Sequence, residues 1–295
     1  MSAPGSIGAR RRVATRLRPG GPRHSARPRR SDRPRGIGPP LRRVLPCALL
    51  VLALLGAWEI YVDVEGLEAQ LLPAPHAVAS ALWHGGSVLW RNFAMTAEEV
   101  ALGLAIALVA GFVLAVVLHL YPLLRRAVYP LAVGSQAVPI PVIGVLLVFW
   151  WGFGILPKLF VIALICFFPV LVTTADALAA VDREQLKLMR TLDASRWQAL
   201  RLAELPAAVP AALSGARIAL AVGVIGAFIA EIATPSTGAY PGLGRQIMSD
   251  INFQTPRAYA GTAILFAFAV ACFYALALAE RALAPWRTRP GGDTP

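Results

Sequence analysis

The side chains that could carry chemistry in this sequence are few, and their spacing fits no common nucleotide-hydrolysing site. The chain has two lysines, Lys158 and Lys187, and neither follows a glycine. A phosphate-binding loop needs a lysine directly after glycine, so that backbone amides and the ammonium group hold the phosphates together. The sequence therefore predicts that this chain does not hydrolyse nucleotides itself.

The cysteines and histidines show no metal-ligand spacing. Cys47, Cys166 and Cys272 each lie within an apolar run, where a thiol behaves as a small hydrophobe. An odd number of apolar-embedded cysteines argues against a disulfide framework. The histidines are equally scattered: His24, His76, His84 and His119. We therefore expect no metal site and no cofactor bound by this chain.

The elements that must position any functional residue are membrane helices. The chain is 57% hydrophobic and 15% charged, with a mean hydropathy of +0.62, which is typical of an integral membrane protein. A helix that crosses about 30 Å of hydrocarbon needs about 20 mostly apolar residues. Six segments qualify: Leu45 to Val62, Glu99 to Leu120, Val128 to Trp150, Lys158 to Ala175, Leu213 to Ile232 and Ala258 to Glu280.

Charge is concentrated at the amino terminus. Residues 1–46 hold 13 arginines and one acid, whereas the remaining sequence is neutral. Because these arginines lie on a Pro/Gly-rich stretch, a folded nucleic-acid-binding face is not indicated. We expect residues 1–43 to be a disordered cytoplasmic tail attracted to anionic lipid; contact with RNA, a transit peptide and a misassigned start stay open. Basic residues elsewhere favour the same side, which predicts that both termini are cytoplasmic.

Polar residues inside the spans are candidates for a translocation pathway. Gln136 is an amide in an apolar span close to two prolines, and an interhelical hydrogen bond is the alternative interpretation. Glu231 lies toward the outer end of the fifth span, either beside a substrate path or as an interfacial anchor. Trp150 and Thr173 complete the set of pathway candidates.

The loop of residues 176–207, between the fourth and fifth spans, is predicted to fold. Asp182 to Leu192 is rich in helix formers and has an apolar stripe at intervals of three. Ser195 and Gln198 have the spacing of a capping box, which predicts a second helix that ends before Pro206. Two amphipathic helices at the membrane surface could lie on lipid or dock into the groove of a partner protein.

Several sequence elements resemble those of ABC-importer permeases. Leu192 to Pro206 is similar to the family's cytoplasmic loop, with Lys187, Leu188 and Met189 at the place of its Glu-Ala-Ala triplet and Asp193 at the place of its glycine. Further similar elements are Leu72 to Pro75, the turn from Trp150 to Lys158, and Gly238 with Gly242, Leu243 and Gly244. The chain is identified as a member of the nitrate, sulfonate, taurine and thiamine-precursor branch of binding-protein-dependent importers.

This resemblance implies an all-α integral membrane fold of the MetI-like permease architecture, with six transmembrane helices. Residues 44–286 would form the permease domain, with its core at about 92–280 and a coupling loop at 176–207, followed by a short cytoplasmic tail at 287–295. The implied assembly is a homodimer in the bacterial inner membrane, with an extracytoplasmic substrate-binding protein and two ABC ATPase subunits that use ATP and Mg. The residues expected to contact the ATPase are Leu192, Ala194, Ser195, Trp197 and Leu200.

The substrate suggested by the resemblance is a small polar organic solute. Ser135 to Pro139, Cys166 to Pro169 and Ala194 to Gln198 look most like permeases for the pyrimidine precursor of thiamine or for riboflavin precursors. Sulfonate, taurine or nitrate remains an alternative for the same machinery. An ion-coupled secondary carrier is the alternative from another class, and a membrane enzyme or scaffold is a third.

Overall fold

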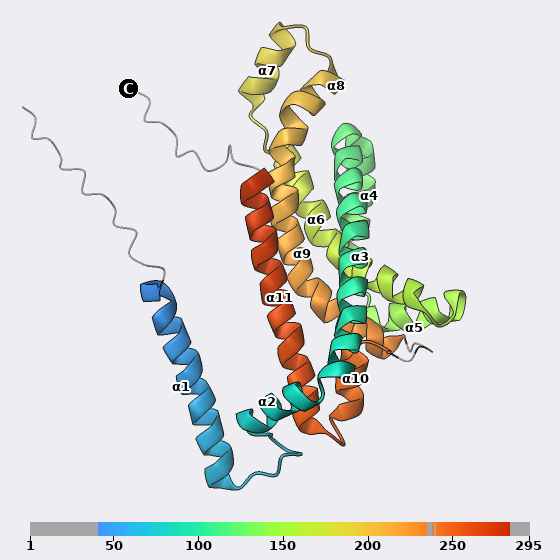
Figure 1. Cartoon of the computed structure of the whole chain (residues 1–295). Helices are drawn as coiled ribbons and strands as arrows, with labels where there is room; N and C mark the ends of the chain where they lie inside the picture. Colours follow the sequence, from blue (N-terminus) through green and yellow to red (C-terminus); the bar gives the residue numbers. More distant parts are fainter. Residues whose placement is uncertain (1–40, 235–237, 239, 284–295) are drawn as a thin grey trace, which may run out of the picture. The chain divides into compact units, whose positions relative to one another are not determined.

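The computed structural model describes residues 41–234, 238 and 240–283, and this part of the chain is helical, without strands (Figure 1). The chain divides into two units, Met1–Leu50 and Val51–Pro295. The described part of the first unit is the beginning of α1 (Leu41–Glu65), a helix that contains the predicted span Leu45 to Val62. Residues 1–40 of the predicted tail and the predicted short tail at 287–295 lie outside the described residues.

Four helices in the described part are long and apolar enough to cross a membrane. With 25 residues or more and a rise of about 1.5 Å per residue, each exceeds the hydrocarbon thickness of about 30 Å. They contain the second, fourth, fifth and sixth predicted spans. These helices are α3 (Gly86–Leu120), α6 (Ile155–Ala179), the continuous helix Arg196–Ala233 that ends with α9 (Leu205–Ala233), and α11 (Thr255–Leu283).

The start of the second span was predicted too late. The predicted span begins at Glu99, whereas α3 begins at Gly86. The structure buries Asn92, Thr96 and Glu99 against other helices. These polar residues therefore belong to the packed interior of a longer helix, where they find hydrogen-bonding partners.

The third predicted span, Val128 to Trp150, is not one helix. The segment contains the end of α4 (Pro122–Ser135) and most of α5 (Ile140–Trp151), separated by a turn. Pro139 and Pro141 lack amide protons and disfavour helical geometry in the residues before them, which accounts for the break. With 12 residues, α5 is too short to span about 30 Å alone. The tight turn predicted after Trp150 is confirmed, because Gly152 and Gly154 adopt positive φ angles before α6 begins.

The core forms where α6 packs between α3 and α9. A Cβ atom on Gly103 of α3 would lie 2.6 Å from Ile162 Cγ2, and one on Gly223 of α9 would lie 2.6 Å from Cys166 Sγ. These two glycines therefore serve close helix packing, since small residues let helix backbones approach in membranes. Cys166 is fully buried among apolar side chains, as expected.

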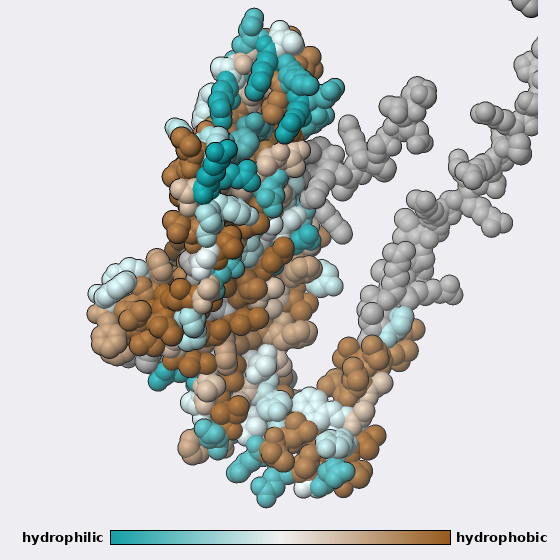
Figure 2. Space-filling model, turned by 180° about the vertical axis from the view of Figure 1, so that it is seen from behind, coloured by the Kyte–Doolittle hydropathy of each residue, from teal (hydrophilic) through white to brown (hydrophobic). Residues whose placement is uncertain are grey.

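The two ends of the second unit carry different elements. At one end lie α2 (Pro75–His84) and α10 (Leu243–Asp250), and at the other lie α7 (Arg183–Thr191) and α8 (Arg196–Ala199) (Figure 1). Hydrophilic side chains gather over the α7 and α8 end, and hydrophobic ones cover the middle (Figure 2). The predicted loop between the fourth and fifth spans is thus folded and polar.

The second loop helix does not end before Pro206. It continues from α8 through a π turn, η1 (Leu200–Glu204), into α9. In this turn the amide of Leu205 donates to the carbonyl of Leu200, one residue further back than in an α-helix. The wider turn precedes Pro206, whose ring would clash with a carbonyl of the preceding α-helical turn. The proline therefore marks a local change of helix type rather than a helix end.

Candidate functional site

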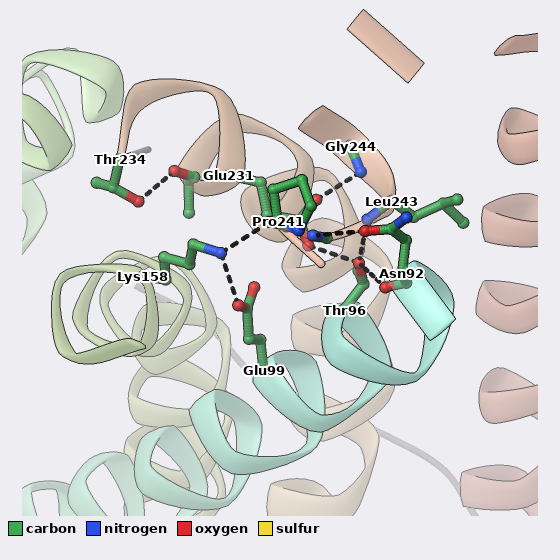
Figure 3. Close-up of polar contacts among 11 residues, drawn as sticks. Asn92, Thr96, Glu99, Lys158, Glu231, Thr234, Pro241, Leu243 and Gly244 are labelled. Carbon is green, nitrogen blue, oxygen red and sulfur yellow. Dashed lines mark hydrogen bonds and ion pairs between the residues drawn. The ribbon is translucent and has the colours of Figure 1, made fainter. Parts of the chain in front are cut away.

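A buried cluster of charged residues joins three helices at the end where α10 lies (Figure 3). Glu99 on α3, Lys158 on α6 and Glu231 on α9 are 1%, 2% and 0% exposed. Lys158 Nζ lies 2.8 Å from Glu99 Oε1. Such residues within membrane helices are costly and usually pair with one another. The ion pair therefore ties α3 to α6 inside the protein.

Lys158 and Glu231, together with Asn92 and Thr96 of α3, hold the segment 241–244, which precedes and begins α10. Lys158 donates to the carbonyl of Pro241 at 3.0 Å, and Asn92 Oδ1 accepts from the amide of Gly242 at 3.1 Å. Thr96 Oγ1 accepts from the amide of Leu243 at 2.8 Å, and Glu231 Oε2 accepts from the amide of Gly244. We call these four side chains, Glu99 and this segment the polar clamp. It fixes four consecutive residues to three helices.

Two glycines let this segment approach the clamp. Gly242 has a φ of 104°, which favours glycine, and a Cβ there would meet the carboxylate of Glu231. A Cβ on Gly244 would lie 2.9 Å from the Cα of Phe228 and 2.7 Å from Glu231 Oε2. The Gly-Leu-Gly element singled out in the sequence is therefore needed for close contact between backbone and carboxylate.

The sequence interpretation missed this cluster. Lys158 is the first residue of the fourth predicted span, yet the structure buries it inside the protein. Glu231 is fully buried and also accepts from Thr96 Oγ1 at 2.5 Å, which distinguishes it from a plain interfacial anchor. One carboxylate oxygen, Glu99 Oε2, has no hydrogen-bond partner within the described residues. The sequence did offer one signal for this cluster. Lys158 and the two acids, Glu99 and Glu231, lie at the ends of predicted spans that face the same side of the membrane.

The four pathway candidates do not converge on one place. Gln136 lines a cavity of about 220 Å³ between α5, α6 and α9, together with Phe168 and Val222. Trp150 is 73% exposed and is not among the lining residues of this cavity. The hydroxyl of Thr173 donates to the carbonyl of Pro169 within α6 at 2.7 Å. Glu231 belongs to the polar clamp.

The two predicted helices of the coupling loop, residues 176–207, are confirmed. Asp182 caps α7, because its Oδ1 accepts from the amide of Glu184 at 2.8 Å. Ser195 and Gln198 form the predicted capping box at the start of α8, with bonds of 3.3 and 2.7 Å. These caps satisfy backbone amides that no helical carbonyl reaches.

Asp193 occupies a backbone position that favours glycine. Its φ is 56°, the one positive value outside glycine in the described residues. The amides of Asp193 and Ala194 donate to the carbonyls of Arg190 and Met189, the pattern of a Schellman motif that ends α7. Asp193 therefore ends α7 in a left-handed conformation, at the cost of a strained backbone.

The predicted ATPase-contact residues differ in exposure. Leu192 and Trp197 are 73% and 62% exposed, Ser195 is exposed, and Ala194 is half-buried. Leu200 is completely buried, which contradicts its expected place on an exposed face. Leu200 is the first residue of the π turn, and its side chain packs inside the protein. Two exposed apolar residues of the loop were missed, Leu188 and Leu202.

Residues 107–286 match the family described as "Binding-protein-dependent transport system inner membrane component". The chain belongs to this family. It is an ABC importer permease, a multi-pass protein of the plasma membrane, and permeases of this kind are transport components rather than catalysts.

The permease is similar to several characterised relatives over most of its length. It is 32% identical to the formylaminopyrimidine transport permease protein ThiX of Halalkalibacterium halodurans, covering 84% of this chain and 98% of ThiX. It is 31% identical to the riboflavin transport system permease protein RibX of Chloroflexus aurantiacus, covering 82% and 89%. Identity to the taurine transport system permease protein TauC of Escherichia coli is 28%, covering 84% and 92%.

The fold is that of a solved importer permease. A chain of the inward-facing MetNI methionine ABC transporter superposes with a TM-score of 0.52 at 19% identity, covering 70% of this permease and 98% of that chain. At this identity the comparison establishes the MetI-like helical fold.

Breaking the ion pair of the clamp should destabilise the permease strongly. In Lys158→Met the carboxylate of Glu99 loses its cation while remaining buried, which we expect to cost about 3–5 kcal/mol. The measurement is thermal unfolding of the purified permease in detergent. Lys187→Met is the matched control because Lys187 is exposed. The double variant Glu99→Gln with Lys158→Met should lose less than Lys158→Met alone; equal stability of the two lysine variants would contradict the clamp.

Asp193→Gly should stabilise the coupling loop by about 0.5–1 kcal/mol, because glycine adopts the left-handed conformation without steric strain. Slower amide hydrogen exchange in residues 183–194 is the readout. Asp182→Ala is the opposing control: loss of the cap on α7 should accelerate exchange in the same segment. Faster exchange in Asp193→Gly would mean that the aspartate side chain itself supports the turn.

Proposed function

We propose that this permease is the membrane subunit of an ATP-driven importer and that the coupling loop receives force from a separate ATPase. The single observation that carries the proposal is the unbroken helix Arg196–Ala233. Its first turn stands next to the exposed Leu192 and includes the exposed Trp197, whereas its last turn carries Glu231 of the clamp. A displacement of α8 is therefore carried along one helix to the opposite end of the protein.

The sequence supports an external energy source. Neither lysine has the glycine context of a phosphate-binding loop, so ATP and Mg are used by the partner subunits. The relatives with the highest quoted identities are permease proteins of transport systems, in the words of their names. The ion-coupled carrier considered from the sequence finds less support, because the buried charges are engaged in the clamp.

The proposed assembly is a homodimer with an extracytoplasmic binding protein. An apolar groove of about 570 Å³ runs between α9, α10 and α11 and includes Ile225 and Phe266, which are 60% and 72% exposed. We propose that a second copy fills this groove through van der Waals packing, which drives helix association in membranes. The distribution of basic residues favours both termini in the cytoplasm. The proposed six crossings then need α4 and α5 together to make the third, since neither forms that predicted span alone.

The proposed substrate is a small polar organic solute, with a thiamine pyrimidine precursor as the first choice. ThiX, which has 32% identity and is covered over 98% of its length, is named for formylaminopyrimidine transport. Riboflavin, taurine, sulfonate and nitrate appear in the names of other relatives and define the alternatives.

Trp197→Asp should abolish association with the ATPase, because a charge would replace the largest exposed apolar side chain of the loop. The measurement is co-purification of the ATPase with a tagged permease from membranes. Trp83→Asp is the matched control, since Trp83 on α2 is 85% exposed at the opposite end and should leave association unchanged. Normal membrane insertion with undiminished ATPase association in Trp197→Asp would refute the coupling assignment.

The substrate choice is tested on the binding protein that works with this permease. We expect formylaminopyrimidine to raise its melting temperature, whereas taurine and nitrate leave it unchanged. Thermal shift with each compound at matched concentration is the measurement. A shift with taurine or a sulfonate alone would replace the pyrimidine assignment and leave the importer assignment intact.

A further inference from the structure

A polar cavity of about 300 Å³ lies beside the exposed apolar residues of the coupling loop. It is formed where the end of α3 meets α7, α8 and η1. Arg196, which lines it, directly precedes the exposed Trp197, and Ala194 of the lining follows Leu192 by two residues. A protein that binds Leu192 and Trp197 would therefore contact residues that are next to the cavity lining in the chain. The remaining lining residues are His119, Leu186, Arg190, Ala199 and Glu204.

The cavity lining has an excess of positive charge. The carboxylate of Glu204 is already paired with His119, at 3.1 Å between Oε2 and Nε2. Arg196 donates from Nη2 to the carbonyl of Leu120 at 3.2 Å, which leaves other guanidinium donors free. Within the described residues, the guanidinium of Arg190 has no ion pair or hydrogen bond. The lining therefore holds two permanently charged arginines, Arg190 and Arg196, and one acid, Glu204, which already pairs with His119.

We propose that this cavity receives a carboxylate side chain of the ATPase, held between Arg190 and Arg196. The inference rests on the proposed function, because it assigns the chemistry of the partner surface that covers the coupling loop. An arginine fork matches a carboxylate with two parallel hydrogen bonds. A partner surface without an acid would enclose two guanidinium groups without a counter-charge, which is strongly unfavourable.

The position of the cavity distinguishes a protein acid from an anionic lipid. Exposed apolar side chains flank the cavity on the chain, at Leu192 and Trp197, and core apolar contacts surrounded by charged pairs are typical of protein interfaces. The capped helices α7 and α8 also give the two arginines a fixed backbone frame. A lipid headgroup at this place is the competing outcome in the experiment below.

Arg190→Glu should weaken the affinity of the permease for the ATPase by at least about tenfold. The measurement is the dissociation constant between the detergent-solubilised permease and the ATPase, at low and high salt. The wild-type affinity should fall with salt, and Arg190→Glu should reduce that dependence. Arg183→Glu is the matched control, because Arg183 is an exposed arginine of α7 outside the cavity lining. Its affinity should stay near the wild-type value.

The outcomes separate this inference from the function on which it rests. If Arg190→Glu binds like Arg183→Glu while Trp197→Asp does not bind, the carboxylate pocket is refuted and the coupling assignment stands. If Trp197→Asp also binds normally, the coupling assignment itself fails. Loss of binding to anionic vesicles without loss of ATPase affinity in Arg190→Glu would assign the cavity to lipid and overturn the inference. Restoration of Arg190→Glu binding by one acid-to-lysine change on the ATPase would identify the partner residue.

Discussion

The buried ion pair between Lys158 and Glu99 is the contact on which the architecture of this permease depends. It joins α3 to α6 through charges that cannot separate inside the protein without leaving one of them unpaired. The same ammonium group reaches the segment 241–244, and Glu231 and Thr96 hold the next backbone amides. One cluster therefore fixes three helices and the start of α10, which makes this end of the bundle a single rigid unit.

The opposite end of the bundle is built differently. There the chain exposes Leu192 and Trp197 on two short, capped helices and surrounds a positively charged cavity. The π turn at 200–204 lies between these helices and the clamped part of α9. A rigid end, a continuous helix and an exposed polar end are what a membrane subunit needs when its driving force arises in another protein.

Local sequence rules predicted the local structure of this permease well. The capping box at Ser195 and the glycine turn before α6 follow from neighbouring residues alone, and the structure confirms them. The long apolar helices were also predictable, because hydropathy acts over a window of contiguous residues. The family was identifiable despite Asp193, because the resemblance also includes elements outside the loop, such as Leu72 to Pro75 and the turn from Trp150 to Lys158.

The wrong predictions share one physical cause. Contacts between helices that are distant in the sequence determine which residues are buried and how prolines are accommodated. Glu99 was read as a span end because the sequence does not show that Lys158 will lie beside it. Leu200 was expected beside Trp197 on an exposed helix face because the two residues are three apart, whereas tertiary packing buries Leu200 at the start of the π turn. The two-helix structure of 122–151 likewise depends on how the prolines at 139 and 141 are accommodated.

The most direct test of the account is solute uptake by proteoliposomes that contain the purified permease. Vesicles with the permease, its ATPase and its binding protein should accumulate the solute against its gradient only when ATP is supplied, and vesicles with the permease alone should accumulate none. Concentrative uptake by the permease alone under an ion gradient would contradict the account.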